Sequence, residues 1–287
     1  MNAIDIKNLT KDFPGFKLDN LNLTLPSGCI MGLIGENGAG KSTTIKLILG
    51  ALRADAGSIT LLGHNSREMT ALEKEDIGVV LDGVSFPQVM TLRQIEHMFA
   101  LSYTHWDAAE FERLVKKFGL TESRDKKFKD FSRGMRMKLG IAAALSHGAK
   151  LLILDEATAG LDPVVRDEVL DILNDFTRDE THSVLISSHI VSDLEKLCDY
   201  IAFLHKGWLI LFKEKDELLS EYGILRCAKD ELRDLEAGAV LYRRETPYSA
   251  ELLVRRDALP RGITVSPVSI EELFVLMIKS TDTESVG

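Results

Sequence analysis

The segment Gly35-Glu36-Asn37-Gly38-Ala39-Gly40-Lys41-Ser42 constrains the fold of this chain more than any other part of its sequence. It follows an apolar run at residues 30–34 and precedes a helix expected over residues 41–49. Glycines let a backbone wrap closely around an anion, and the N–H groups at a helix N-terminus add positive potential. A glycine-rich turn without a ligand is the alternative, but a strand before the loop and a helix after it favour a phosphate-binding loop.

This loop predicts which side chains would hold a nucleotide. We expect Lys41 to reach the β and γ phosphates and Ser42 to ligate Mg²⁺. The residues expected around the phosphates are Gly35, Glu36, Asn37, Gly38, Ala39, Gly40, Lys41, Ser42 and Thr43.

Two adjacent carboxylates form a second candidate site. The apolar run at residues 151–154 ends in Asp155 and Glu156, and ligands bind α/β sheets at the C-terminal ends of the strands. Asp155 is suited to holding Mg²⁺ through water, and Glu156 could polarise an attacking water. A strand that ends in Asp-Glu is usually only a solvated turn, but the phosphate loop in the same sheet favours the catalytic interpretation.

The hydrophobic pattern predicts an α/β chain with additions. Alternation at residues 4–9 and 21–25 indicates antiparallel strands with one wet face. Continuous apolar runs at 30–34, 77–81, 151–154 and 184–186 indicate a parallel sheet covered by helices on both faces. A helical insertion is expected at about 87–147, where Asp107 and Glu110 form a capping box. Beyond a first domain at 1–212, residues 213–287 predict a small α+β extension, with strands near 239–242 and 251–254 and a helix at 270–278.

Composition restricts the partners and the compartment. The chain has 35 basic and 44 acidic residues and a net charge of −9, which offers no global attraction for nucleic acid. Its first residues lack the pattern of a signal peptide, and no apolar run is long enough to span a bilayer. Cys29, Cys198 and Cys227 lack metal-ligand spacing, so we interpret them as packing residues in a reducing compartment. We therefore expect a cytoplasmic protein whose membrane span, if one is needed, comes from a partner.

Several motifs in order give the chain a specific resemblance. Residues 154–163, Leu-Asp-Glu-Ala-Thr-Ala-Gly-Leu-Asp-Pro, resemble the Walker B motif and D-loop of ABC transporter ATPases, and residues 131–135, Phe-Ser-Arg-Gly-Met, are similar to the signature sequence of that family. His189 matches the family's switch histidine, and Phe13 stands where the family places an aromatic that stacks on adenine. Residues 1–212 thus resemble the nucleotide-binding subunit of an ABC transporter, with a RecA-like P-loop NTPase core and an antiparallel β subdomain.

The resemblance implies a shared site. Two such subunits dimerise head to tail around ATP, so that Ser132, Gly134 and Asp162 of one subunit complete the phosphate site of the other. His189 would contact the γ-phosphate and position water with Glu156. Local explanations also exist: Ser132 and Asp162 are suited to cap helices, Phe13 could be core, and His189 could lie on the surface.

Two departures from the family pattern stand out. Asp82 occupies the position of the usual glutamine, and Arg133 and Met135 replace the usual Gly and Gln of the signature. A carboxylate can still ligate Mg²⁺ but cannot donate a hydrogen bond when ionised. We expect Asp82 to keep a metal role, and we expect an active ATPase because Lys41, Asp155, Glu156 and His189 are all present.

The predicted function is that of an ATP-hydrolysing subunit that energises export. Its cofactors would be ATP and Mg²⁺, and its partners a transmembrane permease subunit and a second ATP-binding subunit. It would sit at the inner face of the cell membrane. The alternative is a soluble ABC ATPase in translation or DNA maintenance, although the acidic balance gives no support for a nucleic-acid surface. A P-loop kinase or GTPase would not explain the signature-like segment or His189.

Overall fold

The computed structural model describes residues 1–83, 86–228, 238–245, 249–260 and 262–284. Its first layer is an antiparallel sheet in the order β2-β1-β4-β5. The strands are β1 (Asn2–Phe13), β2 (Phe16–Pro26), β4 (Ala56–Leu61) and β5 (His64–Asn65). In β1, Ile4 and Ile6 are buried and pair with the equally buried Leu25 and Leu23 of β2. This burial confirms the antiparallel strands predicted from the alternation.

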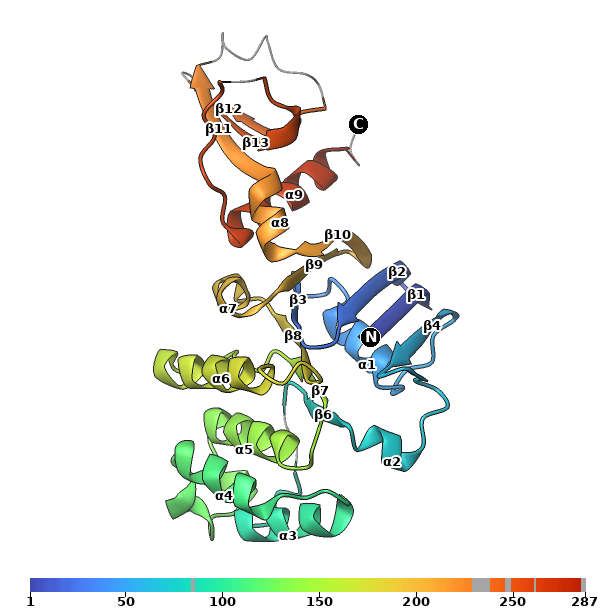
Figure 1. Cartoon of the computed structure of the whole chain (residues 1–287), viewed down its shortest axis with the longest axis vertical. Helices are drawn as coiled ribbons and strands as arrows, with labels where there is room; N and C mark the ends of the chain where they lie inside the picture. The colour runs from blue at the N-terminus through green and yellow to red at the C-terminus, as the bar shows by residue number, and fades with distance from the viewer. Residues whose placement is uncertain (84–85, 229–237, 246–248, 261, 285–287) are drawn as a thin grey trace.

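The second sheet forms the centre of the molecule, in the order β10-β9-β3-β8-β7-β6 (Figure 1). Its strands are β3 (Ile30–Gly35), β6 (Ile77–Val80), β7 (Leu151–Asp155), β8 (Ser183–Ser188), β9 (Tyr200–His205) and β10 (Trp208–Glu214). All adjacent pairs are parallel except β9 and β10. The four continuous apolar runs form strands of this sheet, as predicted, except that Leu81 follows the end of β6.

Successive residues of β3 contribute to two different cores, because side chains alternate across a strand. Met31 and Leu33 pack with the antiparallel sheet and with α1 (Lys41–Ile48). Ile30 and Ile34 instead join the core on the other face of the sheet, together with residues of α6 and α7. These two helices span Pro163–Phe176 and Val191–Leu197. Burial on both faces explains why β3 has no exposed residue.

The helical insertion extends from the β6 edge of the sheet (Figure 1). It contains α3 (Leu92–Ser102), α4 (Ala108–Lys117) and α5 (Arg133–Leu145), and the short α2 (Ala71–Lys74) precedes β6. The predicted capping box at Asp107 is only half right. Asp107 Oδ1 accepts a hydrogen bond from Glu110 N at 2.9 Å, but the Glu110 carboxylate pairs with Arg113, and Asp107 N donates to Ser146 O instead. Glu110 therefore stabilises its own helix face rather than closing the box.

The C-terminal part contains a smaller antiparallel sheet in the order β11-β13-β12. Its elements are α8 (Lys215–Glu221), β11 (Tyr222–Ala228), β12 (Val240–Glu245), β13 (Ser249–Arg255) and α9 (Ile270–Glu284). A short 3-10 turn spans Arg256–Ala258 here, and two more, Thr121–Ser123 and Phe128–Asp130, lie in the helical insertion. The strands and final helix predicted here are present, but β11 was not anticipated.

The hydrophobic core continues from the central sheet into the C-terminal part. Phe274 of α9 packs edge-on against Phe203 of β9, with ring centroids 5.1 Å apart. The N–H of Ile270 donates to Glu195 Oε2 on α7 at 3.2 Å. The division proposed at 212/213 falls inside β10 and is crossed by this core. The boundary between two domains at 212/213 therefore stays a prediction, and no break in the described core marks it.

Candidate functional site

The phosphate loop connects the end of β3 to the start of α1. Its conformation needs glycine at three positions. Gly38 and Gly40 have φ values of 83° and 114°, in the left-handed region that glycine adopts without steric cost. A Cβ on Gly35 would lie 2.7 Å from Leu204 O on β9. No side chain caps α1, so its N-terminal end is available to an anion.

The side chain of Lys41 is buried against the backbone of this loop. Its side chain is only 5% exposed, and its Nζ donates to Gly35 O at 2.7 Å and to Glu36 O at 3.3 Å. The same Nζ lies 3.4 Å from Glu156 Oε1. A buried ammonium requires such compensation, so the two most important predicted residues, Lys41 and Glu156, are brought into contact.

A pocket of about 640 Å³ opens over the loop. Segments distant in sequence contribute to it: the turn between β1 and β2, the phosphate loop, the ends of β6, β7 and β8, and the start of α5. It is lined by Gly15, Phe16, Glu36, Asn37, Gly38, Gly40, Lys41, Ser42, Thr43, Asp82, Arg133, Glu156, Ala159 and His189. The pocket thus collects most of the residues predicted from the sequence.

Sequence reasoning missed the aromatic that lines this pocket. Phe16 lies along it, whereas Phe13 is not among its lining residues, and their ring centroids are 6.4 Å apart. A Cβ on Gly40 would approach the Phe16 ring at 3.1 Å, so Phe16 also packs against the phosphate loop. The predicted adenine contact of Phe13 stays a prediction, and Phe16 is a second candidate for it.

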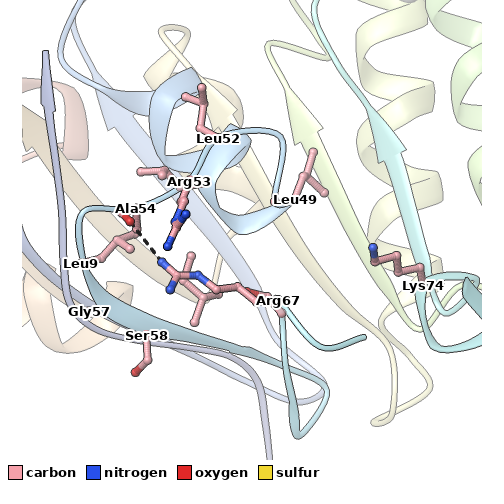
Figure 2. A pocket seen from close by; sticks show the side chains of 13 residues that line it. Leu9, Leu49, Leu52, Arg53, Ala54, Gly57, Ser58, Arg67 and Lys74 are labelled. Atoms are coloured by element: carbon pink, nitrogen blue, oxygen red, sulfur yellow. Dashed lines mark hydrogen bonds between the residues drawn. The ribbon is translucent and has the colours of Figure 1, made fainter. Parts of the chain in front are cut away.

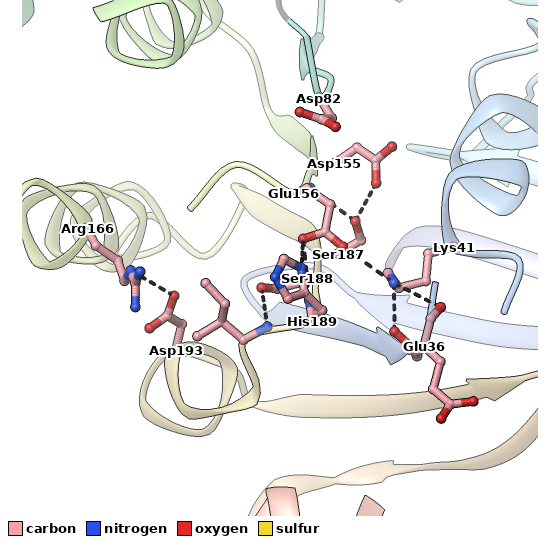
Figure 3. Close-up of polar contacts among 12 residues, drawn as sticks. Glu36, Lys41, Asp82, Asp155, Glu156, Arg166, Ser187, Ser188, His189 and Asp193 are labelled. Atoms are coloured by element: carbon pink, nitrogen blue, oxygen red, sulfur yellow. Dashed lines mark hydrogen bonds and ion pairs between the residues drawn. The ribbon is translucent and has the colours of Figure 1, made fainter. Parts of the chain in front are cut away.

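The two carboxylates at the end of β7 are fixed by the neighbouring strand β8 (Figure 3). Ser187 Oγ donates to Asp155 Oδ1 at 2.5 Å. The backbone N–H of Glu156 is 3.1 Å from Ser187 O and 3.2 Å from Ser187 Oγ. Glu156 has φ 54°, which turns the chain sharply as it leaves the strand. Ser187 was not predicted, because a serine within a strand carries no local signal.

His189 closes the same cluster. Its Nδ1 lies 2.6 Å from Glu156 Oε2, and its backbone N–H points to the same oxygen at 3.4 Å. One oxygen of Glu156 therefore faces Lys41 while the other faces His189. This arrangement places a carboxylate, an ammonium and an imidazole at one wall of the pocket, the groups needed to bind phosphate and to activate water.

The predicted metal ligands all carry oxygen, which suits Mg²⁺. Ser42 and Asp82 line the pocket, and Asp155 is buried beside it with one oxygen bonded to Ser187. Among the residues that the structure describes, no three His, Cys, Asp or Glu side chains are grouped to hold a metal ion by themselves. A metal here would therefore depend on the serine hydroxyl and on phosphate oxygens as well.

Residues predicted to act across a dimer lie outside this chain's own pocket. Ser132 Oγ accepts from Met135 N at 3.3 Å and caps α5. Asp162 Oδ1 accepts from Val165 N at 3.1 Å and caps α6, ahead of Pro163 at its first turn. Both residues thus have the local role considered above, and their role in a second subunit stays a prediction, as does that of Gly134.

A separate pocket of about 340 Å³ lies between the end of α1 and the antiparallel sheet (Figure 2). Arg67 Nη2 donates there to Ala54 O at 3.2 Å, and Arg53 lies beside it. None of the predicted site residues lines it. The motif residues therefore converge on the pocket over the phosphate loop.

Comparisons with known proteins agree with this geometry. The family model described as ABC transporter matches residues 18–159. The chain is 31% identical to the uncharacterized ABC transporter ATP-binding protein YhcH of Bacillus subtilis (strain 168), over 98% of each chain. It is 38% identical to the lantibiotic transport ATP-binding protein SrtF of Streptococcus pyogenes, over 74% of this chain and 91% of the relative.

A solved structure of an ATP-binding subunit of an ABC transporter superimposes with a TM-score of 0.69 at 27% identity, covering 75% of this chain and 91% of that one. Across the described ranges, no helix has the length and apolar character needed to cross a membrane. The chain belongs to the ABC transporter family, among its ATP-binding proteins.

Proposed function

We propose that this chain hydrolyses ATP in a Mg²⁺-dependent reaction and thereby energises export by a separate transmembrane subunit. The observation that carries the proposal is the contact of Glu156 with both Lys41 and His189 inside the pocket over the phosphate loop. An unrelated glycine-rich turn would not need a buried lysine, a carboxylate and an imidazole at one point. The name of the relative SrtF, a lantibiotic transport protein, supports an export role.

The proposed role of each residue follows from its position in the site. Lys41 and the N-terminal end of α1 would bind the phosphates, because both present positive potential at the loop. Glu156 would accept the proton of the attacking water, and His189 would hold that carboxylate in place while facing the γ-phosphate. Ser42, Asp82 and Asp155 would hold Mg²⁺, which neutralises charge on the phosphates when bound. A second subunit would supply Ser132, Gly134 and Asp162 to complete each site.

The first experiment compares the purified wild type with Glu156→Gln. The substitution keeps the shape of the side chain but removes the proton acceptor, so we expect ATP turnover to fall by about 10²- to 10⁴-fold with ATP affinity retained. Glu122→Gln, an exposed carboxylate in the helical insertion, is the matched control and should keep full activity. Unchanged turnover in Glu156→Gln would contradict the catalytic role.

A second experiment addresses the partner and the location. The chain, isolated with its native membranes, should co-purify with a protein that spans the membrane several times. It should be recovered at the inner face of the cell membrane. Recovery with ribosomes or DNA, and without such a protein, would instead support the soluble ABC ATPase alternative. That outcome would overturn the export role while leaving ATP hydrolysis in place.

A further inference from the structure

Arg133 and Asp82 form an ion pair at the mouth of the nucleotide pocket. Arg133 Nη2 lies 2.9 Å from Asp82 Oδ1, and both residues line the pocket. They are 51 residues apart in sequence: Asp82 follows β6 of the central sheet, and Arg133 is the first residue of α5. Their side chains are 56% and 54% exposed, so water and ions can reach the pair.

The backbone at Gly160 leaves room for the arginine side chain. Gly160 has φ 74°, and a Cβ there would lie 3.2 Å from Arg133 Nη1 and 3.4 Å from Arg133 Cδ. The arginine therefore lies across the segment that follows Glu156. From the start of α5 it thus contacts two other parts of the site: the end of β6 and the turn after β7.

This placement connects the two departures from the family pattern. In the sequence, Asp82 in place of glutamine and Arg133 in place of glycine are separate observations. In the structure the negative charge of one faces the positive charge of the other. A glycine at position 133 would leave the Asp82 carboxylate without this partner, and a glutamine at position 82 would give Arg133 no charge to pair with.

We propose that Arg133 is a positioning residue that competes with Mg²⁺ for the carboxylate of Asp82. The inference rests on the proposed function, because it needs a metal-nucleotide complex in this pocket. A guanidinium bound to one oxygen of a carboxylate partly neutralises its charge and repels a cation that approaches it, so the carboxylate binds metal less tightly. Arg133 thus lowers the affinity of Asp82 for the metal ion that accompanies the nucleotide.

The expected size follows from the exposure of the pair. Exposed ion pairs are weak and contribute little free energy, so removing Arg133 should tighten metal binding by about two- to fivefold. The effect must depend on Asp82, since a general change in charge near the pocket would act on the metal whatever residue stood at position 82.

The test measures Mn²⁺ binding, by electron paramagnetic resonance, to the full chain saturated with a non-hydrolysable ATP analogue. Arg133→Ala should bind Mn²⁺ about two- to fivefold more tightly than the wild type, and Arg133→Lys should lie between them. In an Asp82→Asn background, Arg133→Ala should have no further effect. Arg93→Ala is the matched control, because Arg93 forms a similarly exposed ion pair with Asp125 in the same helical insertion.

The outcomes separate this inference from the proposed function. Binding of the analogue is measured first, by fluorescence in the presence of Mg²⁺. If the wild type fails to bind it, the proposed function is overturned and the inference falls with it. If it binds normally but Arg133→Ala leaves Mn²⁺ affinity unchanged, or tightens it equally in the Asp82→Asn background, the competition is refuted and the proposed function stands.

Discussion

The imidazole Nδ1 of His189 lies 2.6 Å from Oε2 of Glu156. The two residues follow adjacent parallel strands, β7 and β8, so the sheet itself sets their separation. Glu156 leaves β7 with φ 54°, an unusual conformation for a residue other than glycine. The cluster is therefore positioned by the geometry of the backbone.

The first prediction concerns this contact. His189→Ala removes the group that holds one oxygen of Glu156, so we expect kcat to fall by about 10²-fold with little change in KM. Steady-state ATPase assays measure both. His97→Ala, on the exposed face of α3, should behave as the wild type. An unchanged kcat in His189→Ala would show that the contact has no part in the chemistry.

Ser187 should support the metal site without lining the pocket. Its hydroxyl holds Asp155 Oδ1 at 2.5 Å, and partners of metal ligands typically contribute about 10- to 100-fold in metal affinity. Ser187→Ala should therefore raise the Mg²⁺ concentration needed for half-maximal ATPase activity by a similar factor. Ser188→Ala, whose hydroxyl instead accepts from Ile190 N, should keep the wild-type requirement. Equal Mg²⁺ requirements in the two variants would argue against this role.

Two aromatic substitutions test which ring meets the base. Stacking on an aromatic ring is worth about 1–3 kcal/mol, so loss of Phe16, which lines the pocket, should weaken ATP binding about tenfold. Phe13→Ala should have a smaller effect, because Phe13 lies outside the lining. Titration with a fluorescent ATP analogue gives both affinities. The reverse order would restore Phe13 as the adenine contact.

Stability should depend on His147 at mildly acidic pH. His147 is 3% exposed, stacks on Tyr103 and has Nδ1 2.9 Å from Glu75 O. Burial lowers its pKa below the usual 6.5, so the unfolded chain takes up a proton more readily than the folded one. The free energy of unfolding should therefore decrease as the pH falls through 6.5.

Urea unfolding followed by tryptophan fluorescence, at about pH 7.5 and about pH 5.5, measures this decrease. His147→Gln, which cannot titrate, should show a smaller loss than the wild type. His97→Ala, exposed on α3, should lose as much as the wild type. Equal losses in all three proteins would mean that other groups set the acid sensitivity.

The sequence predicted those parts of the site that depend on local patterns. The phosphate loop and the Asp155–Glu156 pair lie at the ends of continuous apolar strands. Such strands can be recognised in a sequence from their runs of apolar residues. Phe16 and Ser187 were missed for different reasons. Phe13 and Phe16 flank one tight turn, and only its three-dimensional course decides which ring lines the pocket. Ser187 acts through β8 pairing with β7, a contact between residues distant in sequence.

The link between Arg133 and Asp82 was also beyond local patterns. Each residue was recognised as unusual from its position in a motif, but their pairing depends on how α5 packs beside β6. The capping box at Asp107 failed for a similar reason, because Ser146 O accepts the N–H that Glu110 was expected to bind. Competing tertiary partners decide such cases.

The packing of Phe274 on Phe203 has a consequence for the order in which the chain is completed during synthesis. Phe203 belongs to β9, which pairs directly with the phosphate-loop strand β3, and its partner Phe274 lies in α9. A nascent chain can form the loop early, but its central core lacks this side until α9 has left the ribosome. The core beside the phosphate-loop strand therefore reaches its final packing only after α9 has been synthesised.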